Sequence, residues 1–256
     1  MPEQTKIKLL GLFLIFLLTS FNSREKLIKV YLIGDSTISI KEVSKYPEKG
    51  WGMPFAWFFD SGIKVDNRAM NGRSTKSFIS EKRWDAVKDS LKAGDYVFIQ
   101  FGHNDEVPTK KSYTTETEFV ANLSRFVEES RKRNAIPVLI TPVARRLFNE
   151  DGKVQDSHKE YAQLVRNTAT KLDVPLIDLS EKSMALLQEL GVEKSKYLFN
   201  HLKPGQNPNY PKGLEDNTHF NELGARYMAE LVLADIKKLN LSLREHIVQP
   251  EVKKQQ

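Results

Sequence analysis

Five short apolar runs, rich in β-branched and aromatic residues, recur along the chain and are separated by longer stretches of mixed polarity. Apolar runs that are nearly continuous, instead of alternating with polar residues, are typical of strands covered on both faces. The runs therefore predict five buried strands, at residues 26–34, 63–70, 95–102, 135–143 and 174–180.

The stretches between and after these runs show the spacing of helices. In the last of them, apolar side chains recur at helical intervals on one face, at Met228, Leu231, Val232, Ile236 and Leu239. The pattern predicts helices at 77–91, 115–133, 157–172, 181–190 and 221–239. Strands that alternate with helices imply right-handed crossovers and a parallel sheet, so we expect a three-layer α/β/α domain.

The N-terminal residues follow a different pattern. Lys6 and Lys8 precede an apolar core at 9–18, and a short polar stretch follows, which is the order of a secretory signal peptide. The core is shorter than the roughly 20 residues that a membrane-spanning helix needs. We therefore expect a signal peptide at 1–23 and a secreted or periplasmic protein with no stable membrane anchor after cleavage. An uncleaved anchor and a buried first helix are the alternatives.

The remaining chain is expected to form one domain at 24–245, followed by a C-terminal tail at 246–256, because we find no repeat and no second domain. Within the domain, the stretch 196–220 breaks the alternation of strands and helices with three prolines and two glycines. A loop of this length in a compact domain is usually functional or disordered. Its aromatic residues argue against disorder, so we expect a functional loop.

Composition narrows the classes of function. Hydrophobic residues make up 40% and charged residues 28% of the chain, which is the balance of a globular protein. The absence of cysteine excludes disulfides, thiolate metal sites and a cysteine nucleophile. The formal net charge is +6, but the cations are scattered among acidic residues, so we expect no nucleic-acid partner. His, Asp and Glu do not cluster at metal-ligand spacing, so neither a metal nor another cofactor is expected.

Polar motifs follow three of the predicted strands and close the long loop. They are Gly-Asp-Ser-Thr at 34–37, Asn-Gly-Arg-Ser at 71–74, Gly-His-Asn-Asp at 102–105 and Asp-Asn-Thr-His at 216–219. Each motif alone is also typical of a turn or a helix cap. In an open parallel sheet, however, the carboxyl ends of the strands meet at one edge, where ligands bind. The four motifs together therefore predict a single site.

The side chains of these motifs have the chemistry of acyl transfer. Ser36 needs a base to act as a nucleophile, His219 can supply one, and Asp216 can orient its imidazole. The backbone N–H groups of Ser36 and Gly72 and the side-chain amide of Asn104 are candidate donors of an oxyanion hole. Because His219 must be neutral to accept the proton, activity is expected to rise with pH around the ordinary histidine pKa of ~6.5.

Ser36, Gly72, Asn104 and His219, in this order and with an Asp-x-x-His pair at the end, resemble the four block residues of the SGNH (GDSL-like) hydrolases. The resemblance extends over about residues 30–234, and no block residue is missing. It implies a flavodoxin-like sheet of five parallel strands. It also implies the catalytic and oxyanion-hole roles given above.

Longer motifs resemble one branch of this family, the rhamnogalacturonan acetylesterases. They are GDSTIS from residue 34, GWG from 50, NRAMNGRSTKSF from 67, QFGHND from 100, TPVARRLF from 141 and NPNYPKGLEDNTHF from 207. The branch implies a serine carbohydrate esterase that removes O-acetyl groups from pectic polysaccharide through an acetyl-enzyme. The alternatives are an acetylesterase for xylan or mannan, a general GDSL-type esterase or lipase, and a carbohydrate-binding protein without turnover. The expected partner is therefore an acetylated polysaccharide or oligosaccharide.

Four other side chains are candidates for contacting the substrate, namely Trp51, Arg145, Arg146 and His201. Trp51 can stack on a sugar ring or close the core behind Ser36. The two arginines follow the fourth predicted strand and can pair with a uronate carboxylate, although a solvated loop or a structural ion pair explains them as well. His201, in the long loop, can line the cleft or be exposed.

Two residues next to the candidate catalytic positions are expected to be structural. Asp35 should hydrogen-bond local backbone and hold the turn. His103 should act as a hydrogen-bonding residue. Neither is needed as a proton acceptor if His219 is the base.

Overall fold

A five-stranded parallel sheet forms the centre of the protein in the computed structural model, which describes residues 27–249. The strands lie side by side in the order β2-β1-β3-β4-β5. Their bounds are β1 (Ile28–Gly34), β2 (Ile63–Asn67), β3 (Tyr96–Gln100), β4 (Ile136–Ile140) and β5 (Leu176–Ile177). The expected flavodoxin-like sheet is therefore confirmed. The expected signal peptide at 1–23 lies outside the described residues.

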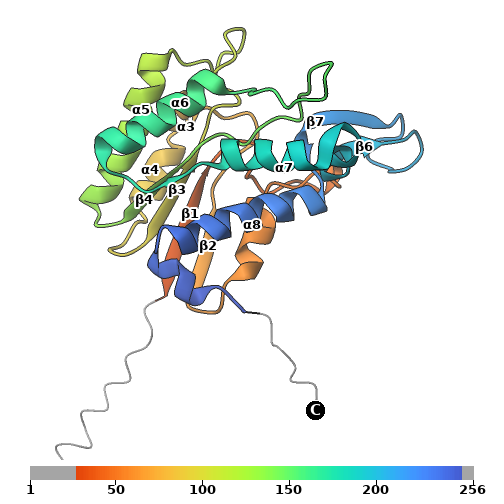
Figure 1. The fold of residues 1–256 in the computed structure, drawn as a ribbon. Coiled ribbons are helices and arrows are strands. Elements are labelled where there is room, and N and C mark those ends of the chain that lie inside the picture. Colours follow the sequence, from red (N-terminus) through yellow and green to blue (C-terminus); the bar gives the residue numbers. More distant parts are fainter. Residues whose placement is uncertain (1–26, 250–256) are drawn as a thin grey trace, which may run out of the picture.

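Helices cover both faces of this sheet, which gives the expected three layers (Figure 1). The α-helices are α2 (Gly52–Phe55), α3 (Thr75–Ser80), α4 (Arg83–Lys88), α5 (Glu116–Lys132), α6 (Lys159–Leu172), α7 (Leu179–Lys194) and α8 (Glu222–Lys238). Short 3₁₀ turns occur at η1 (Val43–Lys45), η2 (Ala56–Phe58), η3 (Ser195–Leu198) and η4 (Ser242–His246). No helix in the part of the chain that the structure describes is long and apolar enough to cross a bilayer.

The two faces of the sheet bury two separate apolar clusters. Along β1, Val30 and Leu32 join a cluster with α2, α7 and α8, whereas Tyr31 and Ile33 join a second cluster with α3, α4, α5 and α6. Alternate side chains of a strand point to opposite faces, so a continuous apolar run is what two covered faces require. The apolar face predicted for the last helix packs into the first of these clusters.

The region expected as one helix at 77–91 contains two. Lys82, between α3 and α4, adopts a left-handed backbone conformation with φ of 58°. A residue in that conformation cannot continue a right-handed helix, and the local sequence carries no glycine or proline to indicate the break. The strands are also shorter than their apolar runs, most of all at β5.

The segment 196–220 was expected to be a loop, and much of it is instead an antiparallel hairpin. It consists of β6 (Phe199–Leu202) and β7 (Leu214–Phe220), so that only 203–213 remains a loop. Phe199 and Phe220 are both buried, with ring centroids 5.0 Å apart. The aromatic residues that argued against disorder therefore anchor a hairpin beside α7 and α8 (Figure 1). As a result, the motif at 216–219 lies on a strand.

Packing continues into the expected C-terminal tail, 246–256. Ile247 is buried and forms a β-bridge with Phe59, and the Val248 N–H donates to the Phe58 carbonyl at 2.9 Å. An apolar side chain and backbone pairing thus hold the first residues of this segment on the domain.

Candidate active site

Ser36 lies in the turn that follows β1, and Asp35 holds that turn. The buried Asp35 carboxylate accepts hydrogen bonds from the backbone N–H and the hydroxyl of Thr37, at 2.9 and 2.8 Å. The same hydroxyl accepts from the side-chain amide of Gln100, at the end of β3, at 2.7 Å. Burial raises the pKa of Asp35, and its bonds to Thr37 oppose that shift. Asp35 therefore has the expected structural position, and Ser36 remains only partly buried.

The three candidate catalytic side chains form a continuous hydrogen-bonded chain. Ser36 Oγ lies 3.0 Å from His219 Nε2, and His219 Nδ1 lies 2.7 Å from Asp216 Oδ2. With the Nδ1–H donated to the carboxylate, Nε2 is free to accept the serine proton. Burial acts to raise the pKa of Asp216, but its bonds to His219 outweigh this and lower the pKa to about 2. The carboxylate is therefore ionised throughout the neutral range.

The hairpin fixes the orientation of this pair. Asp216 Oδ1 accepts from the backbone N–H groups of Thr218 and His219, at 2.7 and 3.0 Å, so the chain folds back over its own carboxylate. On β6, the side-chain amide of the buried Asn200 donates to the carbonyls of His219 and Phe220, each at 3.2 Å. In a regular strand, side chains three residues apart point to opposite faces. The two bonds to Asp216 Oδ1 bend the backbone locally, and this bend lets the Asp216 carboxylate reach the His219 ring.

The expected oxyanion-hole residues Gly72 and Asn104 are tied to one loop. Gly72 has φ of 76°, a conformation that favours glycine, although a Cβ there would meet nothing within 4 Å. Asn104, which is buried, donates from Nδ2 to the Arg73 carbonyl at 3.0 Å. Lys110 Nζ donates to Asn104 Oδ1 at 2.8 Å. Because an ammonium group only donates, this bond fixes the amide with its NH₂ group toward Arg73 and keeps one N–H available.

We expect Lys110→Met to lower kcat about tenfold on a small neutral acetyl ester, with KM nearly unchanged. The substitution removes the donor that orients Asn104, and misplacing an oxyanion donor is felt mainly in the transition state. Steady-state kinetics check this. Lys111→Met is the matched control, since Lys111 is exposed and has no polar side-chain contact among the described residues. Equal kinetics for the two variants would show that Lys110 does not support the amide.

A buried lysine behind the nucleophile was not among the expected site residues. Lys41 Nζ donates to the Ser36 carbonyl at 2.5 Å, to Asn71 Oδ1 at 2.8 Å and to Glu48 at 2.6 Å. The Lys41 side chain has no exposed surface. In the sequence, Lys41 and Glu48 lie in a charged stretch that has the composition of a surface loop, and no periodicity distinguishes them. Only the folded chain brings Lys41 to Ser36 and Glu48 to Lys41.

Trp51 does not contact the cleft, so its place among the candidate substrate residues is wrong. It is fully buried, and its Nε1–H donates to Gln100 Oε1 at 2.9 Å. Its ring packs edge-on against Phe55, with centroids 5.4 Å apart. Of the two expectations for Trp51, closing the core is the one that the structure supports.

The two arginines differ in how they are placed. Arg146 is buried, and all three of its guanidinium nitrogens donate inside the protein, to Ser195, Asn217 and the Val192 carbonyl. Its expected place among the substrate-contacting residues is therefore wrong. Arg145 is partly exposed and donates to the Thr218 hydroxyl at 3.0 Å, next to His219. It also lies 3.6 Å from Glu106, which partly neutralises it. Arg145 thus stays a candidate.

His103 belongs to a buried pair of histidines beside the site. Its Nε2–H donates to the Val143 carbonyl at 3.0 Å, and its ring lies against that of His158 at 4.1 Å between centroids. His158 Nδ1 pairs with Glu106 at 2.8 Å. Burial holds the pKa of His103 well below its usual value, so the ring stays neutral. Among the described residues, no group of three or more His, Asp or Glu side chains is arranged to hold a metal ion.

Comparison with known proteins gives a consistent set of similarities. The model of the GDSL-like Lipase/Acylhydrolase family matches residues 32–227, a range that includes every residue of the site. The rhamnogalacturonan acetylesterase RhgT of Bacillus subtilis is 43% identical over 230 residues, which cover 90% of this chain and 98% of that protein. The probable rhamnogalacturonan acetylesterase YesY of the same organism is 38% identical over 86% of this chain and 97% of its own length.

A solved structure supports the fold independently. The crystal structure of the YxiM protein of Bacillus subtilis matches with a TM-score of 0.72 at 24% identity, over 84% of this chain and 57% of that one. At this identity the likeness concerns the fold alone. Together with the family match, it confirms the resemblance that the sequence motifs predicted.

Proposed function

This chain belongs to the GDSL-like lipase/acylhydrolase family and is a carbohydrate acetylesterase, and we propose that it deacetylates pectic polysaccharide through an acetyl-enzyme on Ser36. The observation that carries the proposed mechanism is the chain from Ser36 Oγ through His219 to Asp216, with distances of 3.0 and 2.7 Å. These are the contacts that activate a serine hydroxyl.

In the proposed reaction, Ser36 Oγ attacks the acetyl carbonyl while His219 Nε2 takes its proton. The N–H groups of Ser36 and Gly72 and the Asn104 amide stabilise the oxyanion that forms. His219 then returns the proton to the departing sugar oxygen, which leaves the acetyl group on Ser36. Water, deprotonated by His219, hydrolyses this ester and releases acetate. Asp216 keeps the imidazole in the required tautomer during both acetylation and deacetylation of Ser36.

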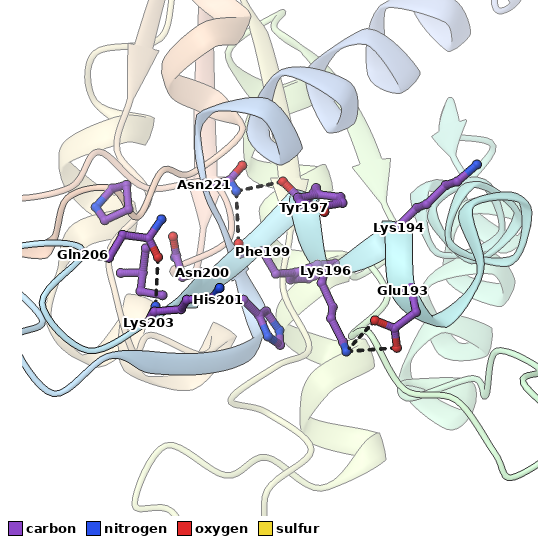
Figure 2. Close-up of a pocket in the computed structure, with 12 residues that line it drawn as sticks. Glu193, Lys194, Lys196, Tyr197, Phe199, Asn200, His201, Lys203, Gln206 and Asn221 are labelled. Carbon is purple, nitrogen blue, oxygen red and sulfur yellow. Dashed lines mark hydrogen bonds and ion pairs between the residues drawn. The ribbon is translucent and has the colours of Figure 1, made fainter.

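A basic groove next to the catalytic strand supports a polyanionic substrate (Figure 2). The groove has a volume of about 600 Å³ and is lined by residues that include Lys194, Lys196, Tyr197 and Lys203. Lys196 pairs with Glu193 at 3.0 Å, whereas Lys194 and Lys203 have no acidic partner among the described residues. Tyr197 is 73% exposed and offers a ring face to a sugar. Pectic chains carry both carboxylates and sugar rings.

The groove borders the strand that holds the catalytic pair. His201, which lines it, lies 2.9 Å from Asn217, the residue after Asp216. Asn200, also in its lining, donates to the His219 carbonyl. His201 thus lines this groove, whereas Ser36, Asp216 and His219 do not, and it stays a candidate for contacting the substrate. A polysaccharide bound in the groove would lie against the hairpin that positions the base.

We expect Lys194→Gln with Lys203→Gln to raise KM several-fold for an acetylated pectic oligosaccharide and to leave a neutral acetyl ester unaffected. Exposed cations that attract a polyanion act on binding, and salt screens that attraction. The wild-type KM for the pectic substrate should accordingly rise with ionic strength. The double variant Lys237→Gln, Lys238→Gln, on the exposed end of α8, is the charge-matched control. If both doubles behave alike, the groove does not bind the polymer.

The test of the proposed substrate is acetate release from acetylated pectin, xylan and mannan by the same enzyme preparation. The proposal expects pectin with rhamnogalacturonan segments to be deacetylated with the highest kcat/KM. Preferential deacetylation of xylan or mannan would contradict the proposed pectic substrate but would leave the serine mechanism intact. A lack of acetate release from every substrate, with retained binding to pectin, would favour a binding protein.

A further inference from the structure

The buried amine of Lys41 connects three parts of the active site that are distant in sequence. It contacts the carbonyl of Ser36, the side chain of Asn71, which precedes Gly72, and the carboxylate of Glu48. We propose that Lys41 and Glu48 are a charge-balanced pair of positioning residues, which aligns the nucleophile with the oxyanion loop and sets the pH range over which His219 acts as a base. This inference rests on the proposed serine mechanism.

The first role follows from the two neutral contacts. Lys41 Nζ lies 2.5 Å from the Ser36 carbonyl and 2.8 Å from Asn71 Oδ1. The Ser39 hydroxyl also donates to Asn71 Oδ1, at 2.5 Å. One amine thus holds the turn after β1 against the loop after β2, and these two segments supply both expected backbone donors of the oxyanion hole. Losing the amine leaves the Ser39 hydroxyl as the remaining side-chain donor to Asn71 Oδ1 and so loosens the contact between the two segments.

The second role follows from the charges. A Glu48 oxygen lies 4.0 Å from His219 Nε2, the nitrogen that must be unprotonated for catalysis. A carboxylate at that distance attracts any positive charge that the ring acquires. Lys41, 2.6 Å from Glu48, offsets that carboxylate. Burial lowers the pKa of Lys41, and its bond to Glu48 opposes this shift. The charge of the buried Lys41 is therefore supported by Glu48.

Other titratable groups near His219 or near the pair are left unchanged by the test. Asp216 on β7 and His103 after β3 interact with His219 itself, and Arg145 after β4 donates to Thr218, the residue before it. Asp35 after β1 interacts with Lys41, and Tyr210 in the loop between β6 and β7 interacts with Glu48 and Asp216. Because these groups remain the same in every variant below, a shift in the pH profile can be assigned to the Lys41–Glu48 pair.

The experiment is the pH profile of kcat/KM on a chromogenic neutral acetyl ester for the wild type, Lys41→Met, Glu48→Gln and the double variant. Lys41→Met leaves Glu48 uncompensated, so the acid-side midpoint should rise by about one pH unit. Glu48→Gln removes the carboxylate that lies 4.0 Å from Nε2, so the midpoint should fall. The double variant should return near the wild-type midpoint.

The plateau rates separate the two roles. Lys41→Met and the double variant both lack the amine that joins Ser36 to Asn71. Their plateau kcat should therefore be at least about tenfold below that of the wild type. Glu48→Gln keeps the amine and should keep its plateau. Lys88→Met on α4, which removes a lysine paired with Asp85, is the control and should match the wild type in both respects.

The proposal would be overturned if the midpoints of Lys41→Met and Glu48→Gln moved in the same direction, or if neither midpoint moved. If Lys41→Met does not fold, Glu48→Gln alone decides, because a midpoint that fails to fall contradicts the charge balance. Ser36→Ala is measured in parallel: if it remains active, the serine mechanism has failed, whereas an inactive Ser36→Ala with unshifted profiles refutes only the role of the pair.

Discussion

Replacing Ser36 with alanine is expected to lower kcat by about 10⁴-fold or more, the largest effect of any single substitution in this protein. The hydroxyl is the only group placed to attack the carbonyl within reach of His219 Nε2 among the described residues. Its removal therefore eliminates the covalent route and leaves only the oxyanion donors and binding. Acetate release measured at saturating substrate, wild type against variant, checks this.

The loss should occur without loss of stability. Ser36 is partly exposed, and the only hydrogen bond of its hydroxyl among the described residues is the one to His219. Thermal unfolding of Ser36→Ala should match the wild type within about 2 °C, since a partly exposed hydroxyl contributes little. Ser80→Ala, at an exposed position of α3, is the control and should keep full activity. Substantial activity of Ser36→Ala would show that another nucleophile operates.

Asp216→Asn should have the second largest effect, with kcat lower by about 10⁴-fold. Asparagine keeps an oxygen for the N–H groups of Thr218 and His219, so the local fold should persist. Its amide group would face His219 Nδ1 with a donor, which favours the tautomer that has the proton on Nε2. That tautomer cannot accept the serine proton.

The ratio of wild-type kcat to Asp216→Asn kcat should not change between pH 5 and pH 8 through any titration of Asp216. Its pKa is lowered to about 2, so the wild-type carboxylate stays ionised over this whole interval. Because folding lowers the pKa of Asp216, any stability that its carboxylate contributes is fully present above the pKa it has in the unfolded chain. That contribution is lost as the pH falls toward 2. Glu215→Gln, an exposed neighbour on β7, is the matched control and should retain activity. Similar losses in both variants would point to disruption of the hairpin.

The sheet and the principal site could be predicted because both depend on short-range features. Apolar runs with two covered faces indicate strands such as β1 and β3, and polar motifs at their ends must lie at one edge. Ser36 and Asn104 were placed together on that reasoning, and His219, which closes the long loop, joined them because the four motifs together resemble those of the SGNH hydrolases. The structure brings Ser36 and His219 to 3.0 Å.

What could not be predicted depends on contacts between distant segments. The hairpin of β6 and β7 is held by Phe199 against Phe220, whereas prolines and glycines dominate the local pattern. Lys41 is buried because Glu48 and Asn71 meet it in the folded chain, and a lysine in a charged stretch gives no sign of burial. Trp51 is buried by the same kind of long-range packing.

The central claim, that acetyl transfer proceeds through Ser36, is tested most directly by trapping the intermediate. The wild type is mixed rapidly with a chromogenic acetyl ester, quenched in acid within a turnover, and mapped by peptide mass spectrometry. The account predicts one acetyl group on the peptide that carries Ser36, and none on the corresponding peptide of Ser36→Ala. An acetyl group on another residue, together with undiminished turnover by Ser36→Ala, would contradict it.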